Sequence, residues 1–263
     1  MAEGHMVLHW ARELHALVGF PLQEIRLPRK WAEQSAGFVG RRLDNIETRG
    51  KNLLLHFSNH RSILCHAMRF GFWQIGARGA KLRKSRRHIR LLLRTHKHQA
   101  AFFHGPVVEV LTSRQLVTHR RLQALGPDLL RPDFDRKEVW RRLRRARQRP
   151  VGDALLDQEI VAGIGNIYKA EGLYLAGLDP RRPAGSITGK KINRLWDILV
   201  PLMKRGVETG QIITLAEHLR SNGGRTWVYR RKGRPCYRCG KPVAMVRQGE
   251  SQRSTYFCPG CQK

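Results

Sequence analysis

Apolar side chains near the N-terminus recur at helical spacing and then give way to a different pattern. Between Glu3 and Val18 they gather on one face, and Gly19 follows where a helix-ending glycine is common. The members of this face are Met6, Val7, Trp10, Ala11, Leu14, Leu17 and Val18. The pattern predicts that the chain opens directly into a helix.

From about Phe20 to Thr112, short apolar runs alternate with turn residues, which is typical of short β-strands. The runs are Leu53–Phe57, Ser62–His66, Ile89–Arg94, Ala101–His104 and Val107–Leu111, with a turn at Ser58–His60. Many short strands separated by turns predict an antiparallel sandwich or barrel. Cys65 lies inside one run, and we expect it to be a buried strand residue without chemistry.

The second half of the chain has helical signals, so the predicted fold class is α+β. Asp135, with Glu138 three residues later, matches a capping pair for a helix through Arg147. Further helices are predicted at Ala154–Ala162, Asn166–Ala176 and Thr188–Met203. The Gly-Ile-Gly turn before Asn166 is expected to leave backbone N–H groups and the Asn166 amide exposed at a helix start, where a phosphate can bind.

The charge of the chain points to a polyanionic partner. Fifty Lys and Arg against twenty Asp and Glu leave a formal charge of +30, and nucleic acid is the leading candidate. A membrane surface fits poorly, because there is no long apolar stretch or lipidation signal. No apolar signal segment precedes the first helix, so we expect a cytoplasmic, nucleoid-associated protein with reduced thiols.

Arginines are concentrated on the predicted helix that follows Asp135. They are Arg141, Arg142, Arg144, Arg145, Arg147 and Arg149. A run of charge is usually a solvated face, but this density on one short element makes phosphate contact or nonspecific attraction to DNA an equal alternative.

The last part of the chain carries a four-cysteine array. Cys236 and Cys239 are separated by two residues, as are Cys258 and Cys261, and eighteen residues lie between the pairs. Two such pairs at this separation suit one tetrahedral zinc ion, and the stretch from Val243 to Phe257 can return as a hairpin between them. The alternative of two disulfides is disfavoured in a reducing compartment. We predict one structural zinc ion with no position open for catalysis.

Several short motifs, in this order and spacing, resemble those of the formamidopyrimidine-DNA glycosylase and endonuclease VIII (Fpg/Nei) family, in its Nei-like branch. They are Ala2-Glu3-Gly4-His5, Arg49-Gly50-Lys51-Asn52-Leu53-Leu54, Leu156-Asp157-Gln158, Gly163-Ile164-Gly165-Asn166-Ile167-Tyr168, Trp227-Val228-Tyr229 and Arg253-Ser254-Thr255-Tyr256-Phe257-Cys258-Pro259. The resemblance implies a helix-opened β-sandwich catalytic domain at 1–115, a linker and helix-two-turns-helix domain at 116–222, and a zinc finger at 223–263.

The resemblance also implies the site residues. The residue after Met1, here Ala2, would be the nucleophile, because an α-amine with a pKa of about 8 is substantially unprotonated at neutral pH and can form a Schiff base at C1′ of a damaged nucleotide. Glu3 would protonate the opening sugar and then assist elimination. Lys51 would contact the phosphate beside the lesion, although a solvated turn lysine is the alternative. Asn166 and Arg253 would hold the flanking phosphates.

The nucleophile is also where the chain departs from its relatives. Most members of the family have proline at this position, and this chain has Ala2. A primary amine lowers the nucleophilicity without abolishing it. Members with a primary amine tend towards weaker lyase activity and towards single-stranded or crosslinked substrates.

A segment after the strand that contains Cys65 resembles the part of the family that fills the gap left by a flipped base. Its expected wedge residues are Met68, Arg69 and Phe70. The alternative is that Met68 and Phe70 pack inside the sandwich. The stretch from Ile213 to Trp227 is short for the branch specific for 8-oxoguanine, which favours oxidised pyrimidines, hydantoins or abasic sites as substrates.

Two functions remain open at this point. The first is a base-excision-repair DNA glycosylase with AP lyase activity. The second is a weakened or inactive member that binds damaged, single-stranded or crosslinked DNA without cutting it. In either case we expect a monomer with damaged DNA as its partner, no membrane association and no obligate protein partner.

Overall fold

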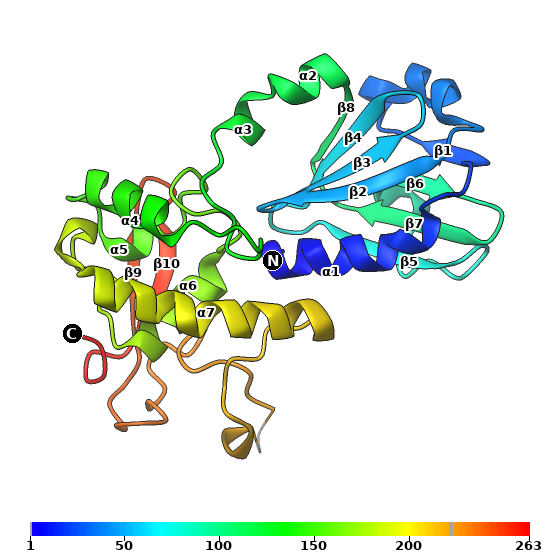
Figure 1. Ribbon diagram of the computed structural model, residues 1–263. Coiled ribbons are helices and arrows are strands. Elements are labelled where there is room, and N and C mark those ends of the chain that lie inside the picture. Colours follow the sequence, from blue (N-terminus) through cyan, green and yellow to red (C-terminus); the bar gives the residue numbers. More distant parts are fainter. Residues whose placement is uncertain (1, 221–222) are drawn as a thin grey trace. The chain divides into compact units, whose positions relative to one another are not determined.

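The computed structural model describes residues 2–220 and 223–263 and divides into two compact units, residues 1–123 and 124–263 (Figure 1). Each unit has its own apolar core. The domain boundaries that the sequence predicts at 115/116 and 222/223 remain predictions.

The first unit is a β-sandwich that follows helix α1 (Gly4–Leu14) and a short 3₁₀ turn, η1 (His15–Leu17). Its strands are β1 (Glu24–Arg26), β2 (Leu43–Arg49), β3 (Asn52–Phe57), β4 (Arg61–His66), β5 (Phe72–Ala77), β6 (Ile89–Arg94), β7 (His98–Phe103) and β8 (Val107–Thr112). They form two antiparallel four-stranded sheets, in the orders β2-β3-β4-β8 and β1-β6-β7-β5 (Figure 1). Shorter helical segments are η2 (Arg29–Phe38), η3 (Arg86–His88), α2 (Ser113–Val117) and α3 (Arg120–Gln123).

The two sheets and α1 share one core. Trp10 and Leu14 of α1 pack with inward residues such as Leu55 of β3, Cys65 of β4 and Phe102 of β7. The helix and the interior strands therefore agree with the apolar pattern, and Cys65 is buried in its strand as predicted. Strands β1, β2 and β5 have no counterpart in the predicted set. All three lie at sheet edges, where exposed polar positions interrupt the apolar runs.

The second unit is built around helices, as the sequence predicts. They are α4 (Arg136–Arg145), α5 (Val151–Ala154), α6 (Asn166–Ala176) and α7 (Gly189–Thr209), with 3₁₀ turns η4 (Ala184–Ser186) and η5 (Glu217–Leu219). The Asp135 carboxylate accepts the Glu138 N–H at 2.9 Å and caps α4. Gly177, at φ 70°, ends α6. Among the described residues, no helix combines the length and the apolar composition needed to cross a bilayer.

The helix predicted at Ala154–Ala162 is wrong beyond its first residue, because α5 ends at Ala154. Side chains that follow compete with the helical backbone for hydrogen bonds. The Asp157 carboxylate accepts the Glu159 N–H at 3.0 Å, and Gln158 accepts the Gly163 N–H at 3.1 Å. The segment between α5 and α6 therefore forms consecutive turns that lead to the start of α6.

The C-terminal part of the second unit is a hairpin of β9 (Ala244–Gln248) and β10 (Arg253–Phe257). β10 packs against α6. A separate apolar cluster joins Tyr174 of α6 to Trp227, Val228 and Val243. The hairpin predicted between the two cysteine pairs is therefore confirmed, and α6 is the element on which it rests.

Candidate active site and metal centre

The first candidate catalytic residues lie directly before α1. Ala2 is half-buried against the sandwich core, and Glu3 is fully buried. The Glu3 carbonyl accepts the N–H groups of Met6 and Val7, at 2.9 and 3.3 Å, so the residue is fixed at the helix start. A buried carboxylic acid side chain thus adjoins the residue whose amine the sequence assigns as the nucleophile.

His5, in the first turn of α1, is buried beneath this end of the chain. Burial lowers its pKa to about 3, and the nearby His9 adds to the effect. The imidazole is therefore neutral at physiological pH. It brings no positive charge to the helix start.

Lys51 lies at the tip of the turn between β2 and β3. Arg49 and Asn52 pair across this turn, and the Asn52 amide donates to the Arg49 carbonyl at 3.0 Å. Gly50 has φ 60°, which suits glycine at the first central position of a two-residue hairpin turn. The hairpin therefore presents Lys51 from a fixed backbone.

His66 ends β4 beside this turn, since β3 and β4 pair Asn52 with His66. Its pKa is lowered to about 4 by burial and by the positive charges of Arg121 and Lys51. The neutral ring can accept a hydrogen bond at Nδ1, and the Met68 N–H lies 3.0 Å from that atom. This bond holds Met68 in the left-handed region, at φ 49°.

The predicted wedge residues follow in a tight turn. Met68 is 51% exposed and Phe70 is 73% exposed, so the alternative that they pack inside the sandwich is wrong. The Arg69 guanidinium lies over the Phe70 ring, 5.7 Å from its centroid. The turn closes through the Gly71 N–H, which donates to the Ala67 carbonyl at 2.8 Å. The structure thus exposes a short apolar and cationic tip.

In the second unit, Asn166 and Arg253 are brought onto neighbouring elements. The Asn166 amide donates to the Ser254 carbonyl at 2.8 Å, which fixes the start of α6 beside the first residues of β10. Asn166 is only 4% exposed, so the expectation of an exposed amide at this helix start is wrong. Arg253, the first residue of β10, is partly exposed.

A buried lysine stands behind this arrangement. Lys169 is fully buried, and its Nζ donates to Asn166 Oδ1 at 2.7 Å and to Thr255 Oγ1 at 2.6 Å. A buried cation is tolerated only when its donors are satisfied, so these bonds fix the geometry closely. The Asn166 carbonyl oxygen is thereby occupied, and the strand that begins at Arg253 is bound to α6.

Glu171 anchors the same helix to the segment before the cysteines. Its carboxylate accepts the backbone N–H groups of Trp227 at 2.6 Å, Val228 at 2.9 Å and Tyr229 at 2.8 Å, and also the hydroxyl of Thr214. Burial raises the pKa of this carboxyl, and the four donors oppose that shift. Trp227-Val228-Tyr229 is therefore held by α6 at a single carboxylate.

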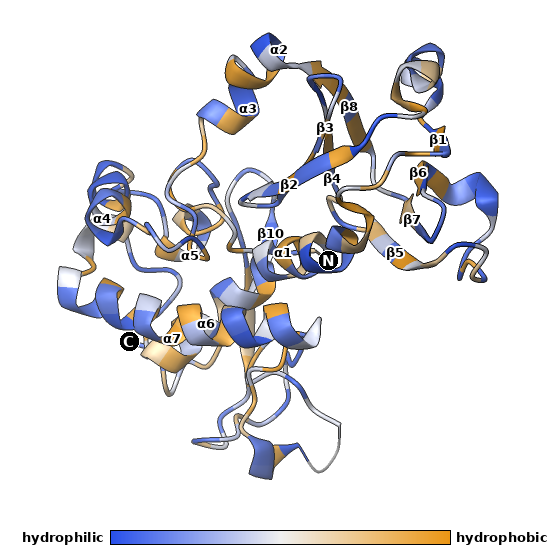
Figure 2. Cartoon of the chain, turned by 45° about the vertical axis from the view of Figure 1, so that its right-hand side comes forward, coloured by the Kyte–Doolittle hydropathy of each residue, from blue (hydrophilic) through white to orange (hydrophobic). Residues whose placement is uncertain are grey.

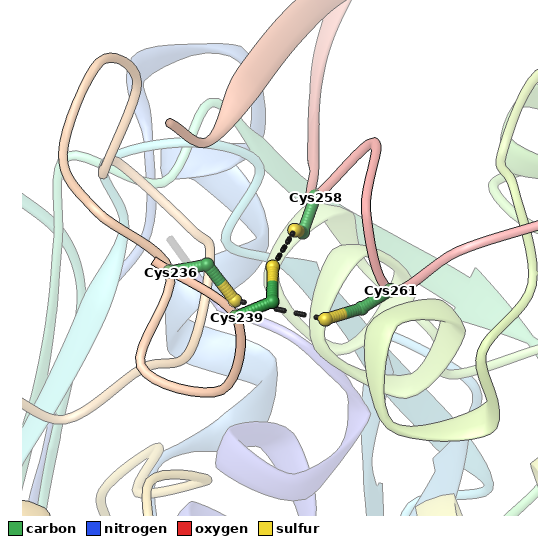
Figure 3. A group of neighbouring side chains, drawn as sticks. All are labelled: Cys236, Cys239, Cys258 and Cys261. Atoms are coloured by element: carbon green, nitrogen blue, oxygen red, sulfur yellow. Dashed lines mark hydrogen bonds between the residues drawn. The ribbon is translucent and has the colours of Figure 1, made fainter. Parts of the chain in front are cut away.

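The four cysteines of the C-terminal array converge on one point (Figure 3). Their Sγ atoms all lie within 4.8 Å of one another, with 3.8 Å between Cys236 and Cys261 and 3.4 Å between Cys239 and Cys258. A Zn–S bond of about 2.3 Å in tetrahedral geometry requires sulfurs roughly 3.8 Å apart, and disulfide sulfurs lie about 2 Å apart. All four thiols are free. The residues fit one zinc ion, whose four ligands leave no open position.

α6 also contacts this metal centre. The Tyr174 hydroxyl lies 3.3 Å from the Cys236 sulfur. A hydroxyl can donate to a thiolate ligand and reduce its negative charge. The helix that begins at Asn166 therefore ends beside the zinc ligands.

Family models match three successive parts of the chain. Residues 1–106 match the formamidopyrimidine-DNA glycosylase N-terminal domain, 125–217 match the formamidopyrimidine-DNA glycosylase H2TH domain, and 233–263 match the zinc finger found in FPG and IleRS.

Curated relatives match over the full length. A probable endonuclease 8 from Streptomyces coelicolor is 35% identical, with 100% of this chain and 94% of the relative covered. Endonuclease 8 from Escherichia coli is 33% identical, with both chains covered completely. The chain belongs to the formamidopyrimidine-DNA glycosylase and endonuclease 8 family. The resemblance stated from the motifs is therefore confirmed, together with the fold class, the zinc finger and the enzyme class, a DNA glycosylase with AP lyase activity.

A solved structure agrees with this membership. Lactococcus lactis Fpg (MutM), in a complex with DNA that contains N7-benzyl-Fapy-dG, superposes with a TM-score of 0.81 at 25% identity, and 99% of each chain is covered. That protein was crystallised on damaged DNA. The fold of this family member thus corresponds to one that is known in a DNA complex.

Three residues that position the site residues of this family member were not predicted from the sequence. His66, Lys169 and Glu171 touch the candidate residues or hold the elements that carry them. His66 is one polar residue at a strand end and gives no pattern. Lys169 and Glu171 could have been predicted as residues with buried partners, because they are charged and lie in the middle of the apolar helix Asn166–Ala176.

Proposed function

We propose that this chain excises oxidised bases from DNA and cleaves the resulting abasic site through a Schiff base at the α-amine of Ala2. The observation that carries the proposal is the pairing of Ala2 with the buried Glu3 at the start of α1. The mechanism requires that the mature chain begin at Ala2. Met1 lies outside the described residues.

The chemistry follows from the two groups. The Ala2 nitrogen attacks C1′, the bond from C1′ to the base breaks, and the base leaves with the electron pair and takes up the proton that the attacking nitrogen loses. Glu3 donates a proton to the sugar oxygen as the ring opens, which leaves an imine between C1′ and the Ala2 nitrogen. The resulting carboxylate then accepts a proton from C2′, and the C3′–O bond breaks so that the 3′ phosphate leaves with its electron pair. Burial of Glu3 keeps water from competing for these transfers.

The remaining site residues have roles in holding DNA. We assign Lys51 to the phosphate beside the lesion, and Asn166 and Arg253 to the flanking phosphates. The Asn166 side-chain oxygen accepts from Lys169, and its nitrogen donates one hydrogen to the Ser254 carbonyl, so one N–H hydrogen remains to donate to a phosphate oxygen. Met68, Arg69 and Phe70 form the wedge. Their exposure supports this role, because a wedge must enter the base stack without first unfolding the sandwich.

The substrate class rests on the stretch from Ile213 to Trp227, of which residues 221 and 222 lie outside the described residues. Its base is closed by the N–H groups of Thr214 and Leu215, which both donate to the Arg225 carbonyl at 2.9 and 3.1 Å. Because these hydrogen bonds close the loop between Thr214 and Arg225, few loop residues remain to cover a flipped purine. Oxidised pyrimidines, hydantoins and abasic sites are the substrates we propose. We also propose a monomer that acts in the cytoplasm.

Borohydride trapping on an abasic-site oligonucleotide tests the mechanism. Protein whose Met1 removal is verified by mass spectrometry is expected to give a covalent adduct, and the same chain with an uncleaved N-terminal tag is expected to give none. Replacement Ala2→Pro is expected to increase trapping, because a secondary amine gives a permanently charged imine. No adduct from the processed protein would exclude the Schiff base.

The isosteric variant Glu3→Gln separates chemistry from binding. We expect it to lose base excision and to keep its affinity for duplex DNA containing an abasic-site analogue, as measured by fluorescence anisotropy. A large loss of affinity would show that Glu3 has a structural role.

The weaker primary amine of Ala2 favours a second candidate, a family member that binds damaged, single-stranded or crosslinked DNA without cutting it. The trapping experiment decides between the two. Binding to an abasic oligonucleotide with no adduct from processed protein is the result that this second function predicts.

A further inference from the structure

The arginines of α4 and the residues after it are not used by the proposed active site. Some of them are neutralised locally. The Glu138 carboxylate bonds both Arg141 and Arg142, each at 2.6 Å. Arg149 is paired with Asp153 at 3.0 Å and with Asp157 at 2.7 Å. Ordinary ion pairs therefore account for the positive charge of these three guanidiniums.

The other three arginines are different. Arg144, Arg145 and Arg147 are exposed, and within the described part of the chain none has a carboxylate partner. With Arg141 they line a hollow of about 630 Å³, whose lining also includes Gly185 and Ser186. No acidic residue lines it within the described chain. We call this surface the arginine face.

One wall of the arginine face is fixed by backbone contacts. The Gly185 N–H donates to the Arg147 carbonyl at 3.2 Å, and the Ala184 N–H donates to the Arg149 carbonyl at 2.8 Å. A Cβ at Gly185 would lie 2.5 Å from Arg147 Cβ, so only glycine allows this approach. The backbone of Arg147 is therefore placed before any ligand binds, although its side chain is free to reach solvent.

An exposed aromatic residue lies on α4 itself. Trp140 is 38% exposed, and the Arg144 guanidinium lies over its ring, 5.4 Å from the centroid. Trp140 also lines a second hollow, of about 380 Å³, together with Lys137 and Asn193. The ribbon of α4 has mainly the blue colour of hydrophilic residues in Figure 2. Unpaired guanidiniums beside an exposed indole are typical of nucleic-acid contacts.

We propose that the arginine face binds the phosphate backbone of a second DNA segment, so that one molecule can bridge two segments. Phosphates suit it because each guanidinium can form two parallel hydrogen bonds to phosphate oxygens. The residues assigned to the lesion in this unit lie on α6 and β10, whereas the arginine face lies on α4, the turn that follows it and η4, which carry none of them. Its charge is therefore available to other DNA while a lesion is held.

The salt dependence of binding to undamaged duplex DNA gives the first test. The plot of log affinity against log salt has a negative slope, to which each phosphate contact adds about −0.9. Replacement of Arg144, Arg145 and Arg147 by Gln is expected to make this slope shallower by about 3. The matched control replaces Arg42, Arg131 and Arg181, which are paired with Asp44, Asp133 and Asp179. It removes the same formal charge and is expected to leave the slope nearly unchanged.

Capture of one duplex by another gives the second test. Duplex DNA on beads is loaded with protein, and a labelled undamaged duplex is added. The unaltered protein and the control variant are expected to retain the label, and the triple Gln variant is expected to lose it. If the triple variant does not fold, Arg145→Gln alone replaces it, with an expected change in slope of about 1.

The remaining outcomes overturn the proposal. An unchanged slope, or an equal change in the control, means that the arginine face does not contact phosphates. A reduced slope without capture by the unaltered protein means that these arginines contact the same DNA as the active site. Neither test requires lyase activity, so a failure of the Schiff-base mechanism would be seen separately in the trapping experiment.

Discussion

The two units of this family member fix their site residues by different kinds of contact. In the first unit, Lys51 and the wedge lie at turns between strands whose inward side chains form one apolar core. In the second, Asn166 and the strand of Arg253 are joined through buried polar groups, Lys169 and Glu171, and through a metal centre. The first unit holds its site residues mainly by packing, and the second, which also has an apolar core, adds directed bonds between the elements that carry its site residues.

This difference affects how each unit should respond to change. Apolar packing is spread over many side chains, and cores tolerate substitutions that conserve volume. A buried polar network depends on every member, because one lost partner leaves a buried donor or acceptor unsatisfied. The second unit should therefore hold its site more rigidly and lose it more abruptly.

Removal of zinc is the strongest test of this contrast. Chelation, or the replacement Cys258→Ser, is expected to unfold the β9–β10 hairpin, because structural zinc contributes about 10 kcal/mol to the folding of small modules. Hydrogen exchange should rise across β9, β10 and Trp227–Tyr229, while the strands of the sandwich keep their protection. Affinity for DNA should also fall, because the unfolded hairpin no longer positions Arg253. Verified zinc loss with unchanged exchange and affinity would contradict both the contrast and the role of Arg253.

Loss of a single buried hydrogen-bond acceptor should have the second-largest effect on stability. Glu171→Gln places an amide NH₂ against backbone donors whichever way it is oriented, so at least one N–H loses its acceptor. We expect a destabilisation of about 1 to 3 kcal/mol, the cost of a buried donor left without an acceptor, confined to the second unit. Denaturant unfolding with hydrogen exchange measures it. The exposed replacement Glu208→Gln, on α7, is the matched control and should change little.

The first unit should respond to acid through His66. Its folded pKa of about 4 lies below the ordinary value of 6.5, so the unfolded state takes up a proton first as the pH falls. The stabilisation is complete above about pH 6.5 and is lost as the pH falls towards 4. It amounts to about 2 kcal/mol after allowance for partial exposure. His5 contributes in the same direction.

The variant His66→Asn isolates this effect. Its side-chain oxygen can still accept the Met68 N–H, but it does not titrate. We expect the stability of the variant to depend less steeply on pH between 6.5 and 4, as followed by urea unfolding at each pH. An unaltered slope would assign the acid sensitivity to other groups.

The smallest expected effect concerns the turn that carries Lys51. Gly50→Ala forces a side chain into a left-handed conformation, at φ 60°, and should destabilise the first unit by about 1 kcal/mol. The melting temperature should fall by about 2 to 4 °C. Gly37→Ala is the control, because a Cβ there meets no atom within 4 Å and its φ is not positive. Equal melting temperatures for the two variants would show that Gly50 is not under conformational constraint.

The sequence predicted those features that depend on local patterns. The opening helix, the interior strands, α6 with its end at Gly177 and the hairpin between the cysteine pairs all follow from spacing and turn residues. The edge strands β1, β2 and β5 could not be predicted in this way, because their polar residues interrupt the apolar runs, whereas the more apolar edge strand β8 was predicted. The segment after α5 was also missed, because the side chains of Asp157 and Gln158 bond to the backbone in place of a helix.

The candidate site was predictable only in part. The metal ligands follow from cysteine spacing, and the motifs supply the site residues by resemblance. The contacts that hold Asn166 could not be predicted from the sequence pattern. Lys169, which bonds Asn166, has its other partner at Thr255, 86 positions away. Long-range partners of this kind leave no local periodicity. The same holds for Arg144, Arg145 and Arg147, which have no carboxylate partner among the described residues and which the sequence could not separate from the arginines that have one.

The buried helix α6 has a consequence for how this protein can be divided and recombined. Along α6, Asn166, Lys169, Glu171 and Tyr174 each bond to a partner between positions 214 and 255. An exchange of α6 alone with that of a relative would separate several of these pairs at once. The smallest exchangeable part of the second unit is therefore α6 together with all of the chain that follows it. Recombination that separates α6 from positions 214–255 should be selected against.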